Sequence, residues 1–159
     1  MITIDVIPQF RNPRVLAQDL RTLVRAVCRR FAVSRARVAV VILGDQPMRR
    51  LNRRFTGRRA ATDCLSFDLS DTLGPSDPRV LEILVNGEKA LREGKARGHG
   101  PRAELALYVT HGLLHHLGFD DGTQAETRLM HRMEDEILQD LGYGVVYDRR
   151  RTRISTGVR

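Results

Sequence analysis

The sequence predicts a single α+β domain in which helices pack on a mixed sheet of about four strands. Apolar and polar residues alternate over residues 2–7, which is the pattern of a strand with one buried face. A continuous apolar, largely β-branched run over residues 38–43 is typical of a central strand covered on both faces. Because a helical pattern separates these two runs, the domain is expected to begin with a parallel β-α-β unit.

The other elements follow from local signals along the chain. The first helix is expected to begin at Asn12 and Pro13, which suit its N-cap and first turn, and to reach Phe31. Two further strands are expected at residues 64–69 and 80–85, on either side of a loop rich in glycine, proline and aspartate. Four further helices are expected: a short one that begins at Pro47, and three over residues 86–97, 102–117 and 123–141.

Arginine dominates the charge of the chain. Lysine and arginine together number 27 against 19 aspartates and glutamates, which gives a net charge of +8. The planar guanidinium matches phosphate geometry, so this charge favours a polyanionic partner such as a nucleic acid. An arginine-rich proteome explains the charge equally well. The short helix from Pro47 is expected to bury Met48, Leu51 and Phe55, and a basic loop follows it.

Nothing in the sequence indicates membrane insertion or export. The apolar stretches are too short to cross a bilayer, and the N-terminus lacks the basic and continuous apolar regions of a signal peptide. We therefore expect a cytoplasmic protein without membrane contact, in which Cys28 and Cys64 stay reduced. The domain is expected to cover residues 1–147, and a basic, flexible tail to follow at residues 148–159.

The segment that begins at His111 carries the candidate chemistry of the chain. On a helix, residues four apart share a face, so His111 and His115 can present both imidazoles to one metal ion. Gly118 permits a left-handed turn that can bring Asp121 back as a third ligand. Three protein ligands leave one coordination position open for water, which is typical of a catalytic site. We therefore predict a transition-metal site, with zinc as the expected ion, on a helix near the C-terminus.

Other interpretations of these residues compete with a metal site. Two histidines alone would fit a solvated helix face equally well, and it is the glycine and the carboxylate in register that favour a metal. Asp120 is an alternative third ligand, but Asp121 stands at the position that the spacing of the motif requires. His116 faces about 100° away from the pair and is expected to have a supporting or packing role. His99 and His131 lie outside the motif and are expected at the surface.

Gly112 argues against a peptidase. It occupies the place of the glutamate that serves as general base in H-E-x-x-H metallopeptidases. The small residue also allows a substrate backbone or a neighbouring strand to come close to the metal.

The histidine motif resembles the signature of the YbeY family of bacterial endoribonucleases, which is similar to H-G-x-L-H-L-x-G-Y-D-H. Six positions are identical in this chain: His111, Gly112, Leu114, His115, Gly118 and Asp120. Phe119 replaces a tyrosine, and His116 stands where leucine is usual. The largest departure is Asp121 in place of a third histidine. This change keeps a ligand but makes the site more anionic, and it would broaden the choice of metal toward harder ions.

A second block, residues 51–67, resembles the family's L-N-x-x-Y-R-G-K-D-x-P-T-D-V-L-S-F. Eight positions are identical: Leu51, Asn52, Gly57, Thr62, Asp63, Leu65, Ser66 and Phe67. The functional arginine of the family aligns with Thr56, so its role does not carry over to this chain. Four arginines flank this position and are expected to bind RNA phosphate in its place: Arg53, Arg54, Arg58 and Arg59. A solvated helix face is the alternative for this basic block.

The resemblance implies a metal-dependent endoribonuclease that acts on single-stranded RNA in rRNA processing and ribosome maturation. It also implies RNA, from rRNA or the ribosome, as the partner. The metal would polarise a phosphoryl oxygen or lower the pKa of its bound water. Because no side-chain base is evident, activated water or the RNA 2′-hydroxyl is the expected nucleophile. Two alternatives stay open: a non-catalytic, ribosome-associated RNA-binding protein with a structural metal, and a metal-dependent hydrolase of another substrate.

Overall fold

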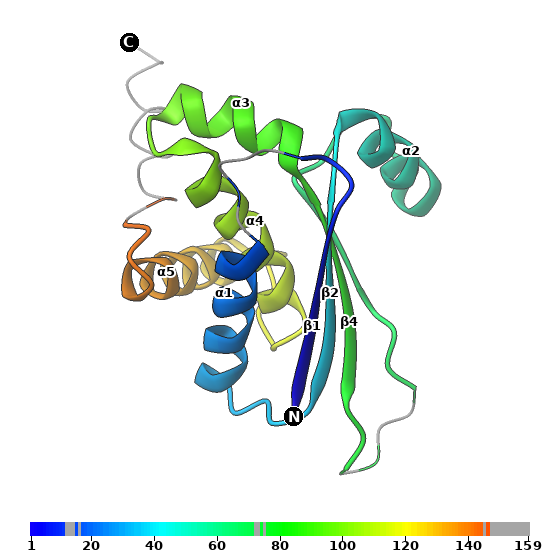
Figure 1. Ribbon diagram of the computed structural model, residues 1–159, viewed down its shortest axis with the longest axis vertical. Coiled ribbons are helices and arrows are strands. Elements are labelled where there is room, and N and C mark those ends of the chain that lie inside the picture. Colours follow the sequence, from blue (N-terminus) through cyan, green and yellow to red (C-terminus); the bar gives the residue numbers. More distant parts are fainter. Residues whose placement is uncertain (12–14, 16, 72–73, 75, 145, 147–159) are drawn as a thin grey trace.

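The computed structural model describes residues 1–11, 15, 17–71, 74, 76–144 and 146. The predicted start of the first helix at Asn12 and Pro13 and the predicted basic tail at residues 148–159 lie outside the described residues. The described chain forms one α+β unit, as the sequence predicts (Figure 1).

A four-stranded mixed sheet with the order β1-β2-β4-β3 forms the centre of the fold. β1 pairs with β2 and β2 pairs with β4 in parallel, whereas β3 pairs with β4 in the antiparallel direction. The parallel β-α-β start and the central place of the second strand are therefore confirmed. The strands are β1 (Ile2–Pro8), β2 (Ala36–Leu43), β3 (Cys64–Asp68) and β4 (Arg79–Asn86).

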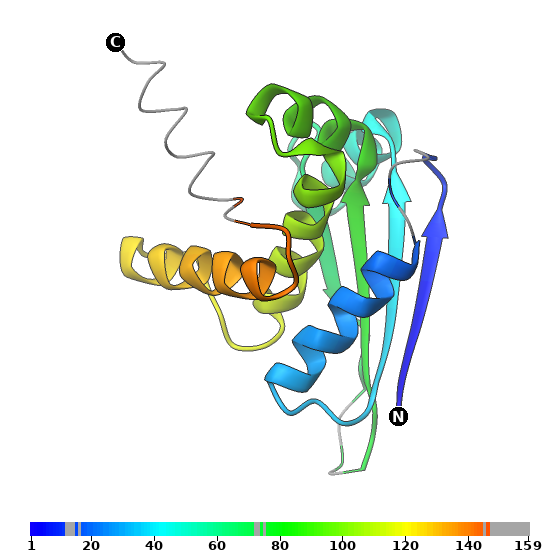
Figure 2. The same ribbon diagram turned by 60° about the vertical axis from the view of Figure 1, so that its left-hand side comes forward.

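In the described part of the chain, five helices cover the two faces of this sheet unequally (Figures 1 and 2). They are α1 (Ala17–Arg30), α2 (Asp45–Thr56), α3 (Gly87–Arg97), α4 (Gly100–His115) and α5 (Gln124–Asp140). α1 and α4 lie on one face, and α3 and α5 pack against α4 to enclose the main core. Among the described helices, α2 alone lies on the other face, over a small second core of four buried residues, Val41, Leu43, Met48 and Leu84.

The ends of the helices follow their capping residues. The Asn86 side chain accepts a hydrogen bond from the Lys89 amide at 2.9 Å, and Thr123 with Glu126 forms a complete capping box. α4 begins at Gly100 instead of Arg102. Pro101 fits the first turn of this helix, because N–H groups in a first turn have no acceptor within the helix and the absence of one costs nothing. The helix also ends at His115 instead of Leu117.

α2 departs from the prediction in one side chain. It begins at Asp45, two residues before Pro47, and Met48 is buried as expected. Phe55, however, was expected to be buried and is 54% exposed. The reason is that the last turn of α2 reaches the edge strand β3, where the ring contacts Phe67 instead of entering the core.

A buried polar cluster at the start of α4 corrects the prediction for His99. The His99 side chain is only 2% exposed, and its Nε2 contacts the carboxylate of Glu104, which is fully buried. Arg97 donates a hydrogen bond to the same carboxylate at 2.9 Å. A buried carboxylate requires such partners, so His99 lies inside the fold and not at its surface.

Cys28 and Cys64 are both free thiols, as expected. Among the described helices, none combines the length and the apolar character that crossing a membrane requires.

Candidate metal centre

The histidine pair lies on the last turn of α4 with both rings turned toward the same point. The Nε2 atoms of His111 and His115 are 3.0 Å apart, and the ring planes are nearly perpendicular at 89°. Their side chains are 31% and 29% exposed, so the imidazoles border on solvent while the helix behind them is buried. The spacing of four residues therefore produces the shared face that the sequence predicts.

Asp121 reaches the pair through the turn that the sequence predicts at Gly118. Gly118 has a φ of +97°, a backbone conformation that favours glycine, and the Phe119 amide donates back to the Leu114 carbonyl at 3.2 Å. The Asp121 carbonyl accepts a hydrogen bond from the Thr127 hydroxyl at 3.2 Å, which ties the turn to α5. The Oδ2 atom of Asp121 consequently lies 3.6 Å from the Nε2 atom of His115.

The three side chains have the spacing that a tetrahedral ion requires. One ligand atom from each of His111, His115 and Asp121 lies within 4.8 Å of the others. Bonds of about 2.0–2.1 Å at tetrahedral angles put neighbouring ligand atoms roughly 3.3 Å apart, between the two separations found here. Asp120 and His116 do not belong to this group. The donor set of two imidazoles and one carboxylate therefore suits a transition metal with a free coordination position.

Glu134 on α5 holds one of these imidazoles, and the sequence analysis did not identify it. Its carboxylate is 1% exposed and lies 2.9 Å from His111 Nδ1 and 3.4 Å from His131 Nδ1. An ionised carboxylate only accepts hydrogen bonds, so Nδ1 of His111 carries the proton and Nε2 keeps a lone pair that can bind a metal ion. His131, expected at the surface, is partly buried because it contacts the same carboxylate.

The helical pattern contained a signal for Glu134. It lies four residues after Met130 and three before Ile137, both of which are buried, so it shares the inner face of α5. A carboxylate on a buried helix face requires a partner. The sequence alone did not reveal that His111 is that partner.

The Glu134 carboxylate and the His111 imidazole shift each other's pKa values. Burial by itself would raise the pKa of Glu134, but hydrogen bonds from His111 and His131 outweigh it and lower that pKa below its ordinary value. Burial likewise opposes the charged form of His111, but the hydrogen bond and charge of Glu134 outweigh it and raise the His111 pKa. The negative charge beside His111 makes the imidazole a better ligand for a cation.

Gly112 allows α4 to approach the sheet closely. A Cβ atom at this position would lie 2.8 Å from Cys64 Sγ and 3.0 Å from the Ile83 Cγ2 atom. Real Cβ contacts are longer, so a glutamate here would collide with β3 and β4. Close approach of a neighbouring strand is thus the role of this glycine in the structure, and the metallopeptidase base has no room.

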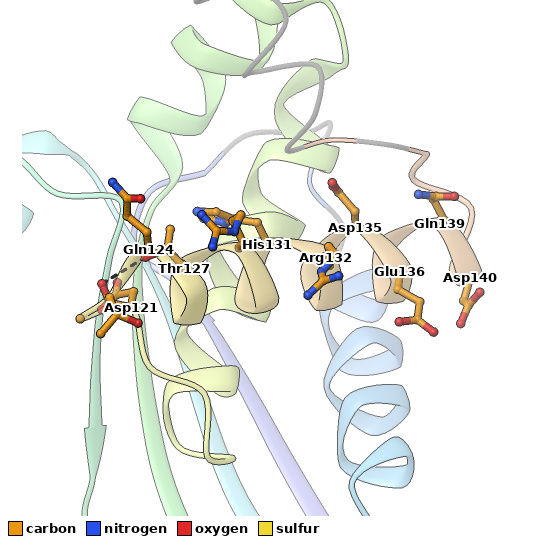
Figure 3. A pocket seen from close by; sticks show the side chains of 12 residues that line it. Asp121, Gln124, Thr127, His131, Arg132, Asp135, Glu136, Gln139 and Asp140 are labelled. Atoms are coloured by element: carbon orange, nitrogen blue, oxygen red, sulfur yellow. Dashed lines mark hydrogen bonds between the residues drawn. The ribbon is translucent and has the colours of Figure 1, made fainter.

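A hollow of about 950 Å³ extends along one face of α5 from Asp121 (Figure 3). Two arginines, Arg128 and Arg132, line the half nearer Asp121, and acidic side chains, Asp135, Glu136 and Asp140, line the half that follows. The hollow adjoins the candidate ligands at one end. It offers no continuous positive surface for a phosphate backbone.

The arginines expected to bind RNA lie on α2 and in the segment that follows it, with α2 on the face of the sheet opposite α4. All four are exposed: Arg53, Arg54, Arg58 and Arg59. Arg53 and Arg59 line a hollow of about 330 Å³ together with Arg49 and Arg50, which the sequence analysis did not single out. A strand of RNA that touched both this hollow and the histidine pair would have to pass from one face of the sheet to the other, and the edge strand β3 offers one such path.

Thr56 stabilises the turn that leads from α2 to β3. Its hydroxyl donates to the Asn52 carbonyl at 2.7 Å and accepts from the Arg58 amide at 3.2 Å. The buried Asn52 side chain donates to the Ala60 carbonyl at 2.8 Å. The segment then reaches Asp63, whose charge helps to raise the pKa of His111. Residues 57–63 therefore connect the arginine-lined hollow to the surroundings of the histidine pair.

Fold and site together define a class of protein: a small α+β domain whose candidate metal ligands lie at the end of a helix packed on a mixed sheet. The chain belongs to the endoribonuclease YbeY family, because the family model described as Endoribonuclease YbeY matches residues 9–142. The family resemblance seen in the sequence motifs is thereby confirmed.

Similar proteins named Endoribonuclease YbeY occur in several bacteria. A protein of Anaeromyxobacter sp. (strain Fw109-5) is 34% identical over 141 residues, which cover 89% of this chain and 73% of that protein. A protein of Geobacillus thermodenitrificans is 33% identical over 153 residues, which cover 89% and 97%. A solution structure from Thermotoga maritima has the same fold, with a TM-score of 0.56, 21% identity, and coverage of 88% and 91%.

Proposed function

We propose that this chain is a metal-dependent endoribonuclease that cleaves single-stranded RNA, with ribosomal RNA in maturing ribosomes as its substrate and the cytoplasm as its location. The observation that carries the proposal is the convergence of His111, His115 and Asp121 on one point in a chain of the YbeY family. The names of the relatives support the reaction class, since each is called an endoribonuclease.

The ligand set supports Zn²⁺ as the ion. Two imidazoles and a carboxylate are a common donor set for catalytic zinc, although the Asp121 carboxylate also suits harder divalent ions. When bound, the ion supplies a Lewis acid for the phosphodiester that is cleaved. His111 and His115 hold it, and Glu134 keeps Nε2 of His111 turned toward it.

The basic surface of α2 supports RNA as the substrate. Arg53, Arg54, Arg58 and Arg59 are exposed and can neutralise phosphates that flank the cleaved bond. The net charge of +8 also attracts a polyanion such as RNA over longer distances. The arginines bind and orient the strand, and the ligand side chains bind the ion on the other face of the sheet.

The proposal is tested with the full chain, purified and assayed for bound metal and for cleavage of single-stranded and duplex RNA. His115→Ala should lose the metal and the cleavage. Asp121→Asn should lose most of both, whereas Asp120→Asn makes the same chemical change at the neighbouring residue outside the ligand group and should keep both. Undiminished cleavage by metal-free His115→Ala would overturn the proposal.

The same measurements separate the other functions. RNA binding with a steep salt dependence and no cleavage would identify a non-catalytic RNA-binding protein. Metal-dependent hydrolysis of another substrate, with RNA left intact, would identify a different hydrolase.

A further inference from the structure

An exposed aromatic pair lies where α2 meets the edge strand β3. The rings of Phe55 and Phe67 have centroids 4.9 Å apart and planes inclined by 57°. Phe67 packs against the small core beneath α2, but Phe55 is 54% exposed. Phe67 thus holds the Phe55 ring in place from one side, and solvent reaches the remainder. A large exposed aromatic ring, fixed by a neighbour, loses little conformational entropy when a ligand contacts it.

The chain segment that carries Phe55 is strongly positive, whereas Phe67 has Glu82 as its partner on β4. Six arginines and no acidic residue occur between residues 46 and 62: Arg49, Arg50, Arg53, Arg54, Arg58 and Arg59. Within the part of the chain that the structure describes, none of them forms an ion pair with a carboxylate. The guanidinium of Arg54 lies 5.6 Å from the centroid of the Phe55 ring. Unpaired guanidiniums beside an exposed ring favour a ligand that carries both phosphate and a flat aromatic group.

The aromatic pair and the histidine pair lie on opposite faces of the sheet, with the strand β3 between them. Successive side chains of β3 point to opposite faces, so Ser66 lies toward Gly112 on α4 while Phe67 lies toward α2. β3 is the last strand of the sheet, and among the described residues it pairs only with β4. An extended ligand can therefore pass around this edge from the metal ligands on one face to Phe55 on the other.

We propose that Phe55, supported by Phe67, is a stacking platform for an unpaired base of the RNA. This inference rests on the proposed function and adds to it a reason for a preference for single strands. The bases of a duplex stack on one another and are not free to cover the ring, whereas those of a single strand are. Arg54 can stack on the same base or turn to its phosphate, and the arginines of the α2 hollow bind the phosphates that follow.

A fluorescence experiment tests the platform directly, since the chain contains no tryptophan. Phe55→Trp in the full chain places one reporter at the platform. Ile7→Trp is the matched control, because Ile7 is 43% exposed and lies on β1, at the opposite edge of the sheet. The probe is a single-stranded oligodeoxyadenylate of about eight nucleotides, within the site sizes of single-strand binders, and the reference is an abasic strand of equal length and charge. Neither probe has a 2′-hydroxyl group.

Quenching of the Phe55→Trp signal by the base-containing strand, but not by the abasic strand, is the expected result. The Ile7→Trp signal should respond to neither. Equal quenching by both strands would show that only charge brings the strand near, and it would overturn the platform. Absence of quenching by either strand would overturn it as well.

Binding affinity gives a second measurement. Phe55→Ala should weaken binding of the base-containing strand by about 5- to 100-fold, the loss typical of one stacked base, and leave the abasic strand unaffected. Phe55→Leu keeps an apolar contact with Phe67 and should show a similar loss, which separates stacking from packing. Unchanged affinity in both variants would overturn the platform. Base-dependent quenching without any RNA cleavage would support the platform and overturn the proposed endoribonuclease activity. RNA cleavage without quenching would support the activity and overturn the platform.

Discussion

Replacing Glu134 with glutamine tests how the fold supports the candidate metal site. The glutamine keeps the size of the side chain but removes the charge that lies 2.9 Å from His111 Nδ1. A neutral amide holds the His111 ring less firmly and makes its Nε2 a weaker donor, which typically lowers metal affinity by about 10- to 100-fold. This range corresponds to roughly 1.4–2.8 kcal/mol of binding free energy. Because Glu134 is almost fully buried, solvent cannot reach the site and compensate for the lost charge.

The affinity is measured by titrating the metal-free protein with Zn²⁺ in competition with a chromophoric chelator. Glu136→Gln is the matched control, since Glu136 is on the same helix but its side chain is 57% exposed and pairs with Arg30. It should bind Zn²⁺ as the unmodified chain does. A Glu134→Gln protein with affinity within twofold of that control, while His111→Ala loses binding, would refute the supporting role of Glu134.

Three further outcomes concern close packing and the thiol of the partly buried residue Cys64. Gly112→Ala should destabilise the fold by about 0.5–2 kcal/mol, because overpacking against Cys64 and Ile83 exceeds the gain in helix propensity. Gly94→Ala should cost more, since its Cβ would lie 2.3 Å from backbone atoms of Gly100 that cannot turn aside; urea denaturation that ranks the two variants the other way would contradict this reasoning. Burial raises the pKa of the Cys64 thiol to about 12, so near pH 8 the native protein should be alkylated there far more slowly than the urea-unfolded chain. Peptide mapping by mass spectrometry follows that site, and native labelling as fast as unfolded labelling would count against the raised pKa of this thiol.

Most of the secondary structure could be predicted from local patterns. Alternation over residues 2–7, the apolar run over residues 38–43 and the capping signals at Asn86 and Thr123 each indicate an element that the structure contains. These signals are local because backbone hydrogen bonds and side-chain periodicity act over a few residues. Phe55 shows the limit of this reasoning: its helical spacing indicated burial, but what lies opposite the last turn of α2 depends on where the sheet ends.

One part of the candidate metal site could likewise be predicted from the sequence, and another part depends on the tertiary structure. The face shared by His111 and His115 and the turn at Gly118 follow from residues close together in the chain. Glu134 is 23 residues from His111, and only the packing of α5 against α4 places its carboxylate at Nδ1.

The sequence by itself determined the class of fold, the three candidate metal ligands, the family motifs and the basic character of the segment after residue 46. Only the tertiary structure decided that β3 is the edge strand and that α2 lies on the face opposite α4. It thereby placed the arginines and Phe55 across one strand from the histidine pair. The physical reason is that strand order and helix placement are set by how apolar faces bury one another across the whole chain, which local periodicity does not specify.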